Sequence, residues 1–112
     1  MLKKIIQVLS LVAMSTYSVA DGPGWTQDSL VVKLVVTANG GVNIKLSPTL
    51  SGCVSQSGYG PYYASIYPSH PGIDRMKADL LAAYMAGKKV AIYLSDSNCT
   101  VGEIILGGWN DP

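Results

Sequence analysis

The chain has 112 residues, of which 48% are hydrophobic, and its eight basic and seven acidic residues give a formal charge of +1. A nucleic-acid-binding domain is expected to be strongly basic, so this balance argues against that class of protein. The charged residues are also scattered, without the run of like charges that marks a membrane-binding patch or an acidic tail.

The first twenty residues have the pattern of a secretory signal peptide. Lys3 and Lys4 open the chain, an apolar run follows over residues 5–14, and residues 18–20 (SVA) supply a small-residue cleavage site. A transmembrane anchor is the competing interpretation, but the run has only about half of the roughly 20 residues that span a bilayer. We therefore predict a secreted or periplasmic protein without a membrane span, whose residues 21–112 form one small domain. Loss of the two leader lysines would leave six basic and seven acidic residues, a formal charge of −1.

Residues 30–47 read as a β-hairpin. The β-branched run over residues 30–37 (LVVKLVVT) predicts a strand that is either buried on both faces or curled around a core. Residues 38–41 (ANGG) tolerate positive φ and suit a tight turn. The return strand over residues 42–47 alternates, so one face is expected to meet the core and the other water. The inward set is Val42, Ile44 and Leu46, and the outward set is Asn43, Lys45 and Ser47.

Four of the seven tyrosines gather between residues 52 and 72, among glycines, serines and prolines. Residues 62–67 alternate and predict a third strand, with Tyr62, Ala64 and Ile66 on one face and Tyr63, Ser65 and Tyr67 on the other. Tyrosine suits recognition, because its rigid ring stacks on sugars or side chains at low entropy cost. Two interpretations stay open: a binding surface made with Gln56, Ser57 and Tyr59, or a strand in which Tyr62 joins the core and the other rings cover the sheet.

The period then changes from that of a strand to that of a helix. Apolar side chains recur at helical spacing at Ile73, Met76, Leu80, Ala83 and Tyr84, and Gly87 is a natural terminator. Two last strands are predicted over residues 89–95 and 103–109, with a turn at residues 96–98. In the first of them Val90, Ile92 and Leu94 are expected to face inward, and Ala91, Tyr93 and Ser95 outward.

Three strands, a helix and two strands follow the order of a small oligonucleotide/oligosaccharide-binding (OB) barrel, in which the helix closes one end. A five-stranded α+β sandwich would have the same order. We favour the barrel, because the long first strand can bend through both halves of it. Trp25 and Trp109, near the two ends, are expected to pack against each other or cap the barrel, and an exposed anchor is the alternative.

Catalytic groups are sparse, since residues 21–112 contain one histidine, one glutamate and one arginine. His70 directly follows Ser69, and adjacent residues cannot readily make the hydrogen bond of a catalytic triad. Cys53 and Cys99 most simply form a disulfide in an exported protein. A metal site or catalytic thiol is the alternative, but the single histidine and the absence of a CxxC spacing weaken both. We therefore predict a non-catalytic protein without a metal or cofactor.

Three features carry a resemblance: residues 25–28 (WTQD), residues 81–93 (LAAYMAGKKVAIY), and one cysteine before the third strand with another late in the chain. Together they resemble the B subunits of AB5 toxins of the subtilase-cytotoxin and typhoid-toxin type. The resemblance implies an OB fold, glycan binding and a ring of five subunits. It also implies sugar contacts from a serine, for which Ser29 is nearest, and from a tyrosine near Tyr93 or one position later, at Leu94.

The stretch LLAAYMAGKKV also resembles a broad group of small, largely uncharacterised secreted proteins of Gram-negative bacteria, which implies no activity. Three hypotheses remain: a glycan-binding module, a protein-interaction or inhibitor domain that recognises a host or cell-surface protein, and a hydrolase that pairs His70 with a carboxylate. The candidate ligand-binding residues are Ser29, Gln56, Tyr59, Tyr63, Tyr67 and Tyr93.

Overall fold

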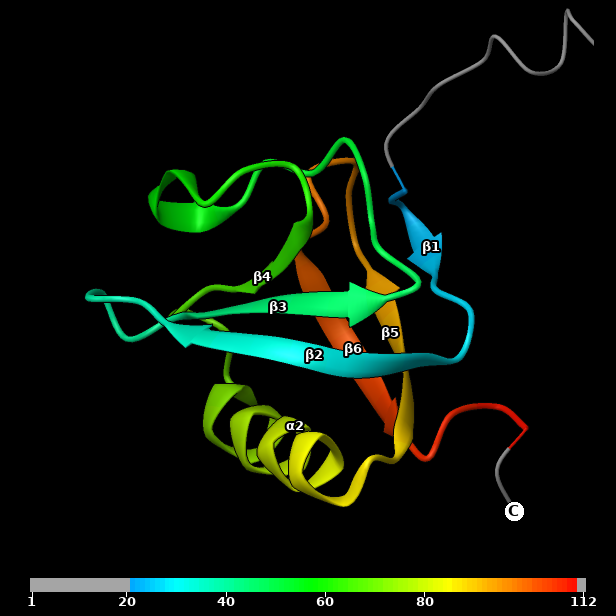
Figure 1. The fold of residues 1–112 in the computed structure, drawn as a ribbon. Coiled ribbons are helices and arrows are strands. Elements are labelled where there is room, and N and C mark those ends of the chain that lie inside the picture. The colour runs from blue at the N-terminus through cyan, green and yellow to red at the C-terminus, as the bar shows by residue number, and fades with distance from the viewer. Residues whose placement is uncertain (1–20, 111–112) are drawn as a thin grey trace, which may run out of the picture.

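The computed structural model describes residues 21–110 (Figure 1), so the predicted signal peptide lies outside the described residues. The long hairpin consists of β2 (Ser29–Val36) and β3 (Val42–Ser47), which pair in antiparallel register from Leu30↔Ser47 to Val36↔Val42. The predicted turn is confirmed at Gly40, whose φ of 91° is a conformation that favours glycine.

The remaining elements complete a curled antiparallel sheet with one helix. They are β1 (Gly24–Trp25), the short 3₁₀ helix η1 (Gln56–Gly58), β4 (Tyr63–Ile66), α2 (Ile73–Ala86), β5 (Lys89–Leu94) and β6 (Val101–Leu106). The helix ends as predicted at Gly87, which adopts φ 67° and donates its N–H to Ala83 O. Within residues 21–110, no helix is both long and apolar enough to cross a membrane.

Strand pairing confirms the OB-like barrel. β3 pairs with β4, and β5 pairs with β6 along one edge and with the start of β2 along the other. The circle is completed where β4 meets the start of β6, through the parallel bridge Ser65↔Thr100 and a hydrogen bond from Ser65 N to Cys99 O of 3.0 Å. The first long strand therefore serves both halves of the barrel, as predicted, and it bends at a register shift between Val31 and Lys33.

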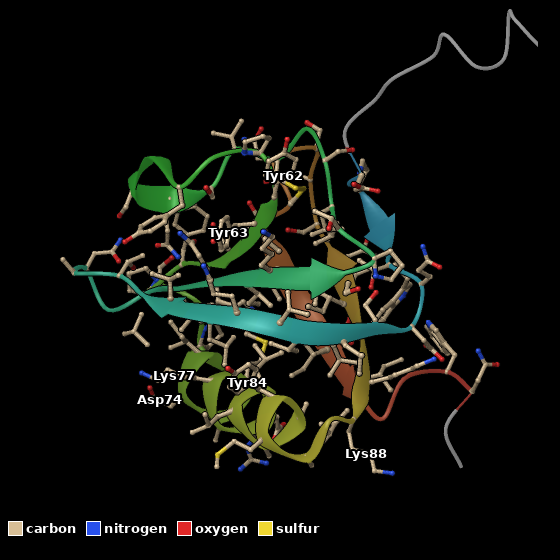
Figure 2. The ribbon with its side chains drawn as sticks, in the orientation of Figure 1. Tyr62, Tyr63, Asp74, Lys77, Tyr84 and Lys88 are labelled. Carbon is tan, nitrogen blue, oxygen red and sulfur yellow. A yellow bond between two sulfur atoms is a disulfide. The ribbon has the colours of Figure 1, made fainter. Side chains whose placement is uncertain are left out.

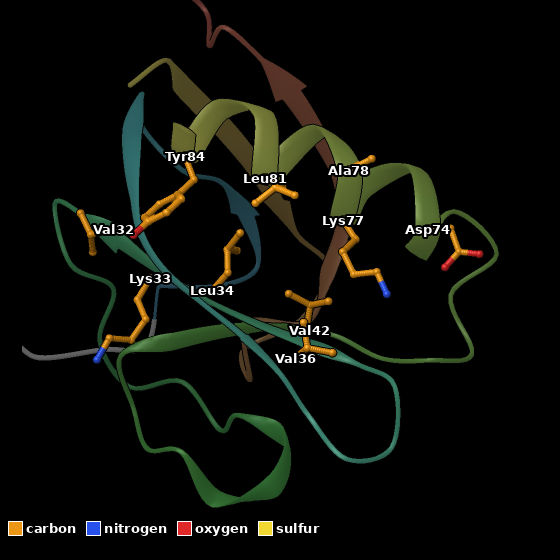
Figure 3. Close-up of a pocket in the computed structure, with 10 residues that line it drawn as sticks. All are labelled: Val32, Lys33, Leu34, Val36, Val42, Asp74, Lys77, Ala78, Leu81 and Tyr84. Atoms are coloured by element: carbon orange, nitrogen blue, oxygen red, sulfur yellow. The ribbon is translucent and has the colours of Figure 1, made fainter. Parts of the chain in front are cut away.

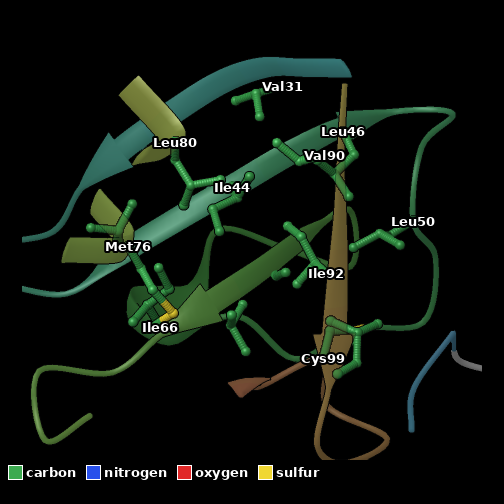
Figure 4. Packing of buried hydrophobic residues seen from close by; sticks show 14 of the residues in the cluster. Val31, Ile44, Leu46, Leu50, Ile66, Met76, Leu80, Val90, Ile92 and Cys99 are labelled. Carbon is green, nitrogen blue, oxygen red and sulfur yellow. The ribbon is translucent and has the colours of Figure 1, made fainter. Parts of the chain in front are cut away.

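The core fills the space between the sheet and α2 (Figure 4). The predicted inward sets of β3 and β5 are confirmed, because each of these six side chains is at most 1% exposed. The helix contributes Met76, Leu80 and Ala83. Next to this core, the predicted disulfide joins Cys53 in the loop before β4 to Cys99 in the turn after β5, with a Cα–Cα distance of 5.2 Å.

Several positions differ from their predicted environments. The strand β2 is not buried on both faces, since Val32 is 44% exposed. Asn43, expected in water, is fully buried because the loop before β4 covers it, and Ala91 is fully buried as well. Tyr62 precedes β4 in a turn and is 50% exposed rather than in the core, and Tyr84 is 49% exposed at the margin of the buried face of α2.

The last strand also starts and ends earlier than predicted. It begins at Val101, directly after the bridge that brings Thr100 beside β4. It ends at Leu106, because Gly107 and Gly108 adopt φ values of 98° and 76° and turn the chain away from the sheet.

Candidate functional site

A buried polar network lies on the outer face of β3 and β4, where the loop of residues 53–60 crosses the sheet. The Asn43 side chain donates to Gln56 O at 3.0 Å and accepts from Ser65 Oγ at 2.7 Å, and Ser65 Oγ in turn accepts from Gln56 N at 3.0 Å. Every buried side-chain polar atom in the described part of the chain has a partner. The network therefore fixes this loop on the sheet, since breaking it would leave buried groups unpaired.

Gln56 is the centre of this network. Its Nε2 donates to Val42 O at 3.3 Å and to Ile66 O at 2.9 Å, and its Oε1 accepts from Asn39 Nδ2 at 3.2 Å. A Cβ on Gly41 would lie 2.3 Å from Gln56 Oε1, so only glycine leaves room for this side chain. Because both amide hydrogens are used inside the chain, Gln56 acts here as a positioning residue.

The fixed loop presents a pair of tyrosine rings. Tyr59, which is 48% exposed, packs edge-on against the half-buried Tyr63 of β4, with ring centroids 5.9 Å apart. Tyr63 is opposite Lys45 in the register of β3 and β4. Beside Tyr59, residues 57–59 and the end of the β2–β3 hairpin (residues 36–38) enclose a hollow of about 280 Å³. We refer to Tyr59, Tyr63, Lys45 and this hollow as the tyrosine face (Figure 2 shows Tyr63 beside β3 and β4).

One disulfide and two hydrogen bonds hold the ends of the same loop. The disulfide fastens its start to the β5–β6 turn, where Val54 N also donates to Asn98 O at 3.1 Å. Ser55 Oγ donates to Gly60 O at 2.9 Å and closes the loop on itself. The tyrosine face therefore rests on a segment whose geometry is set in advance.

A second aromatic group, the tryptophan cluster, consists of Trp25, Tyr93 and Trp109. The Trp25 ring lies 5.4 Å from the ring of Tyr93 and 5.1 Å from the ring of Trp109, and the two tryptophans meet edge to face. The predicted contact between the tryptophans is confirmed, yet Trp25 remains 39% and Trp109 57% exposed. The cluster covers the outer side of β5 without becoming part of the core.

Asp28 holds Trp109 in this cluster. Its carboxylate accepts hydrogen bonds from Trp109 N at 2.7 Å, from Asn110 N at 3.1 Å and from Asn110 Nδ2 at 3.0 Å. The hydrogen bond from Trp109 N, supported by those from Asn110, lowers the pKa of Asp28 against the opposing effect of desolvation. Gly108 allows the close approach, because its φ is 76° and a Cβ there would lie 2.6 Å from Asp28 Oδ1.

Ser29 and Tyr93, the two sugar contacts expected from the toxin resemblance, lie in different environments. Ser29 is 2% exposed, donates from Oγ to Gln27 O at 2.9 Å, and lines a hollow of about 110 Å³ with Trp25. Tyr93 faces outward, while its neighbour Leu94 is 1% exposed and belongs to the core. Ser29 pairs with the inward position Val90, so it and Tyr93 are on opposite faces of the sheet.

Of the candidate residues, Gln56, Tyr59 and Tyr63 come together, whereas Ser29 and Tyr93 belong to the region around Trp25. Tyr67 follows β4, is half-buried and contacts neither aromatic group among the described residues. Lys45 was missed, because a lysine on the outward side of a strand ordinarily indicates only solvent exposure. The alternation that set Lys45 and Tyr63 each outward on its own strand was the available signal.

His70 has both ring nitrogens engaged. Nδ1 accepts from Gly72 N at 2.9 Å, so the hydrogen is placed on Nε2, which lies 2.8 Å from Gly102 O and donates to it. The side chain thus links the start of α2 to β6 instead of pairing with Ser69. In residues 21–110, no group of three or more His, Cys, Asp or Glu side chains is placed to hold a metal ion.

Comparisons of the chain with protein families, with curated proteins and with solved structures found no match.

Proposed function

We propose that this protein is a secreted, non-catalytic glycan-binding module and that the tyrosine face is its binding site. The observation that carries the proposal is the edge-to-face pair of the exposed Tyr59 and the half-buried Tyr63 above the outer face of β3 and β4. In OB barrels the second and third barrel strands and the loop between the first two form the usual ligand surface, and these correspond to β3, β4 and the β2–β3 hairpin.

The chemistry of this face suits a sugar ring. A tyrosine ring offers an apolar surface for the C–H side of a pyranose, and its hydroxyl can bond to the sugar's own hydroxyl groups. Lys45 adds three hydrogen-bond donors opposite Tyr63. The loop that carries Tyr59 is already held by Gln56 and by the disulfide, so binding would lose little additional conformational entropy.

Secretion or residence in the periplasm is part of the proposal. The disulfide supports it, because disulfides persist mainly in oxidising compartments. The resemblance to toxin B subunits adds the proposal of a five-subunit ring, which light scattering on the oxidised protein would test by giving its mass in solution.

The glycan proposal is tested on a glycan array with the oxidised protein and four variants. Tyr59→Ala removes the exposed ring of the tyrosine face and should abolish the signal, whereas Tyr84→Ala removes an equally exposed ring from α2, 49% against 48%, and should keep it. Tyr93→Ala and Ser29→Ala test the region indicated by the toxin resemblance.

An array without a signal from the wild type would refute glycan binding. A signal that survives Tyr59→Ala but disappears with Tyr93→Ala or Ser29→Ala would move the site from the tyrosine face to the region around Trp25. Thermal unfolding of each variant, monitored by circular dichroism, separates a lost contact from a lost fold.

A further inference from the structure

An open apolar groove runs between the outer edge of β2 and the helix α2, and shares only Val36 with the hollow of the tyrosine face. Its volume is about 610 Å³, within the range of ligand-binding sites. Val32, Leu34 and Val36 form one wall, and Ala78, Leu81 and Tyr84 form the other. Figure 3 shows Tyr84 near Val32 at one end of the groove and Lys77 with Asp74 at the other. Exposed patches of this kind mark sites of interaction.

The strand that forms one wall has a free backbone edge. β2 pairs with β5 only at Ser29 and Leu30, while its other edge pairs with β3 as far as Val36. Among the described residues, no backbone hydrogen bond joins the groove side of β2 after Leu30 to another segment. The N–H and C=O groups on that side can therefore accept a further strand.

The two walls have matching lengths. The strand rises about 13 Å from Val32 to Val36 at about 3.3 Å per residue. The helix rises about 15 Å from Asp74 to Tyr84 at about 1.5 Å per residue. The groove therefore has room along its axis for an extended segment of about four or five residues.

The charged side chains of the groove are Lys33, Lys77 and Asp74, which gives it a net positive charge. Within residues 21–110, none of the three forms an ion pair with another described residue. Lys77 is half-buried at one end, so an acidic group of a ligand would find an unused cation there.

We propose that this groove binds an extended peptide segment of a partner protein, which adds as a strand to the free edge of β2. Alternate apolar side chains of the peptide enter between Leu34 and Leu81, and an acidic group of the peptide lies near Lys77. This mode of recognition takes its affinity from main-chain hydrogen bonds and its specificity from the pockets that receive every second side chain. A fatty acid would fill the apolar part but leave the backbone groups of β2 unpaired, and a helix, about 10 Å wide, could not pair with them.

The probe is an array of six-residue peptides in which serine alternates with valine, leucine, isoleucine or tyrosine, with a glutamate or a lysine at either end. Binding of the strongest peptide is then measured by fluorescence anisotropy. We expect binding that weakens at least about tenfold when alternate peptide nitrogens are methylated, because methylation removes the main-chain donors.

Two matched pairs of variants locate the site. Leu81→Lys should weaken binding at least about tenfold, while Met85→Lys, at a more exposed position of α2 outside the groove, should not change it. Lys77→Glu should remove the preference for a glutamate-ended peptide, and Arg75→Glu, an exposed charge reversal outside the groove, should keep that preference.

The proposal is overturned if no peptide of the array binds, if the methylated peptide binds as tightly as its parent, or if Leu81→Lys and Met85→Lys behave alike. It is also overturned if light scattering shows a wild-type oligomer that Leu81→Lys converts to a monomer, because a second copy of the chain would then cover the groove. The Leu81→Lys variant should retain any glycan binding, so this proposal and that of the tyrosine face fail independently.

Discussion

Removal of the disulfide should destabilise the domain by about 4 kcal/mol. Cys53 and Cys99 are 46 positions apart, and the chain-entropy model assigns to a closed loop of this length a loss of denatured-state entropy worth about 4 kcal/mol at 25 °C. A domain of this size is stable by roughly 5 to 15 kcal/mol, so the loss would be a large part of the total. The double variant Cys53→Ala with Cys99→Ala makes the change without leaving a free thiol.

The assay is urea unfolding, followed by tryptophan fluorescence and by circular dichroism. Three samples are compared: the oxidised wild type, the wild type reduced with a thiol, and the double variant. If loop closure is the cause, the last two should have nearly the same free energy of unfolding. Both should also show a larger m-value than the oxidised protein, because their unfolded chains are less compact.

A loss below about 1 kcal/mol in both the reduced protein and the double variant would refute this reasoning. The barrel would then hold the loop of residues 53–60 without the disulfide, through the Gln56 network and the pairing of Ser65 with Thr100. A loss in the double variant alone would instead assign the effect to the packing of two buried side chains, which are 5% and 0% exposed.

Three further outcomes are expected. Gln56→Ala should lower the free energy of unfolding by about 2 to 3 kcal/mol in urea, because it leaves two buried carbonyl groups of β3 and β4 without a donor. The hydrogen bond from Trp109 N lowers the pKa of Asp28 in the folded protein. The Asp28 carboxylate therefore stabilises the folded state fully above the unfolded pKa of about 3.9, and this stabilisation is lost as the pH falls through the lower folded pKa. Acid that takes the pH below the lowered folded-state pKa of Asp28 should therefore change the tryptophan fluorescence, and Asp28→Asn should show that changed spectrum already at pH 7. Gly87→Ala should lower the free energy of unfolding, measured by thermal unfolding, by about 1 kcal/mol, since alanine is strained at φ 67°.

Local patterns in the sequence were sufficient to predict the strands and the helix whose two faces differ clearly in polarity. The alternation of β3 and β5 placed their inward side chains correctly, because a strand that closes a core has a period of two. The helix and its end at Gly87 followed from helical spacing and from the freedom of glycine at positive φ. The order of the elements was then sufficient to predict the barrel, and the single pair of cysteines was sufficient to predict the disulfide.

The environment of an outward-facing residue depended on segments distant in the chain. Asn43 is buried only because the loop around Gln56 crosses β3, and no local sequence pattern predicts that crossing. Trp25 and Trp109 meet because Asp28 accepts hydrogen bonds from the end of the chain, 81 positions away.

The groove between β2 and α2 likewise exists only in the folded barrel. It forms because β5 pairs with β2 at its first two residues alone and leaves the rest of that edge beside the helix. Periodicity therefore determined which side chains of β3 and β5 face the core, since that depends on neighbours in the chain. The tertiary structure decided which of the remaining side chains meet to form a surface, since that depends on long-range pairing.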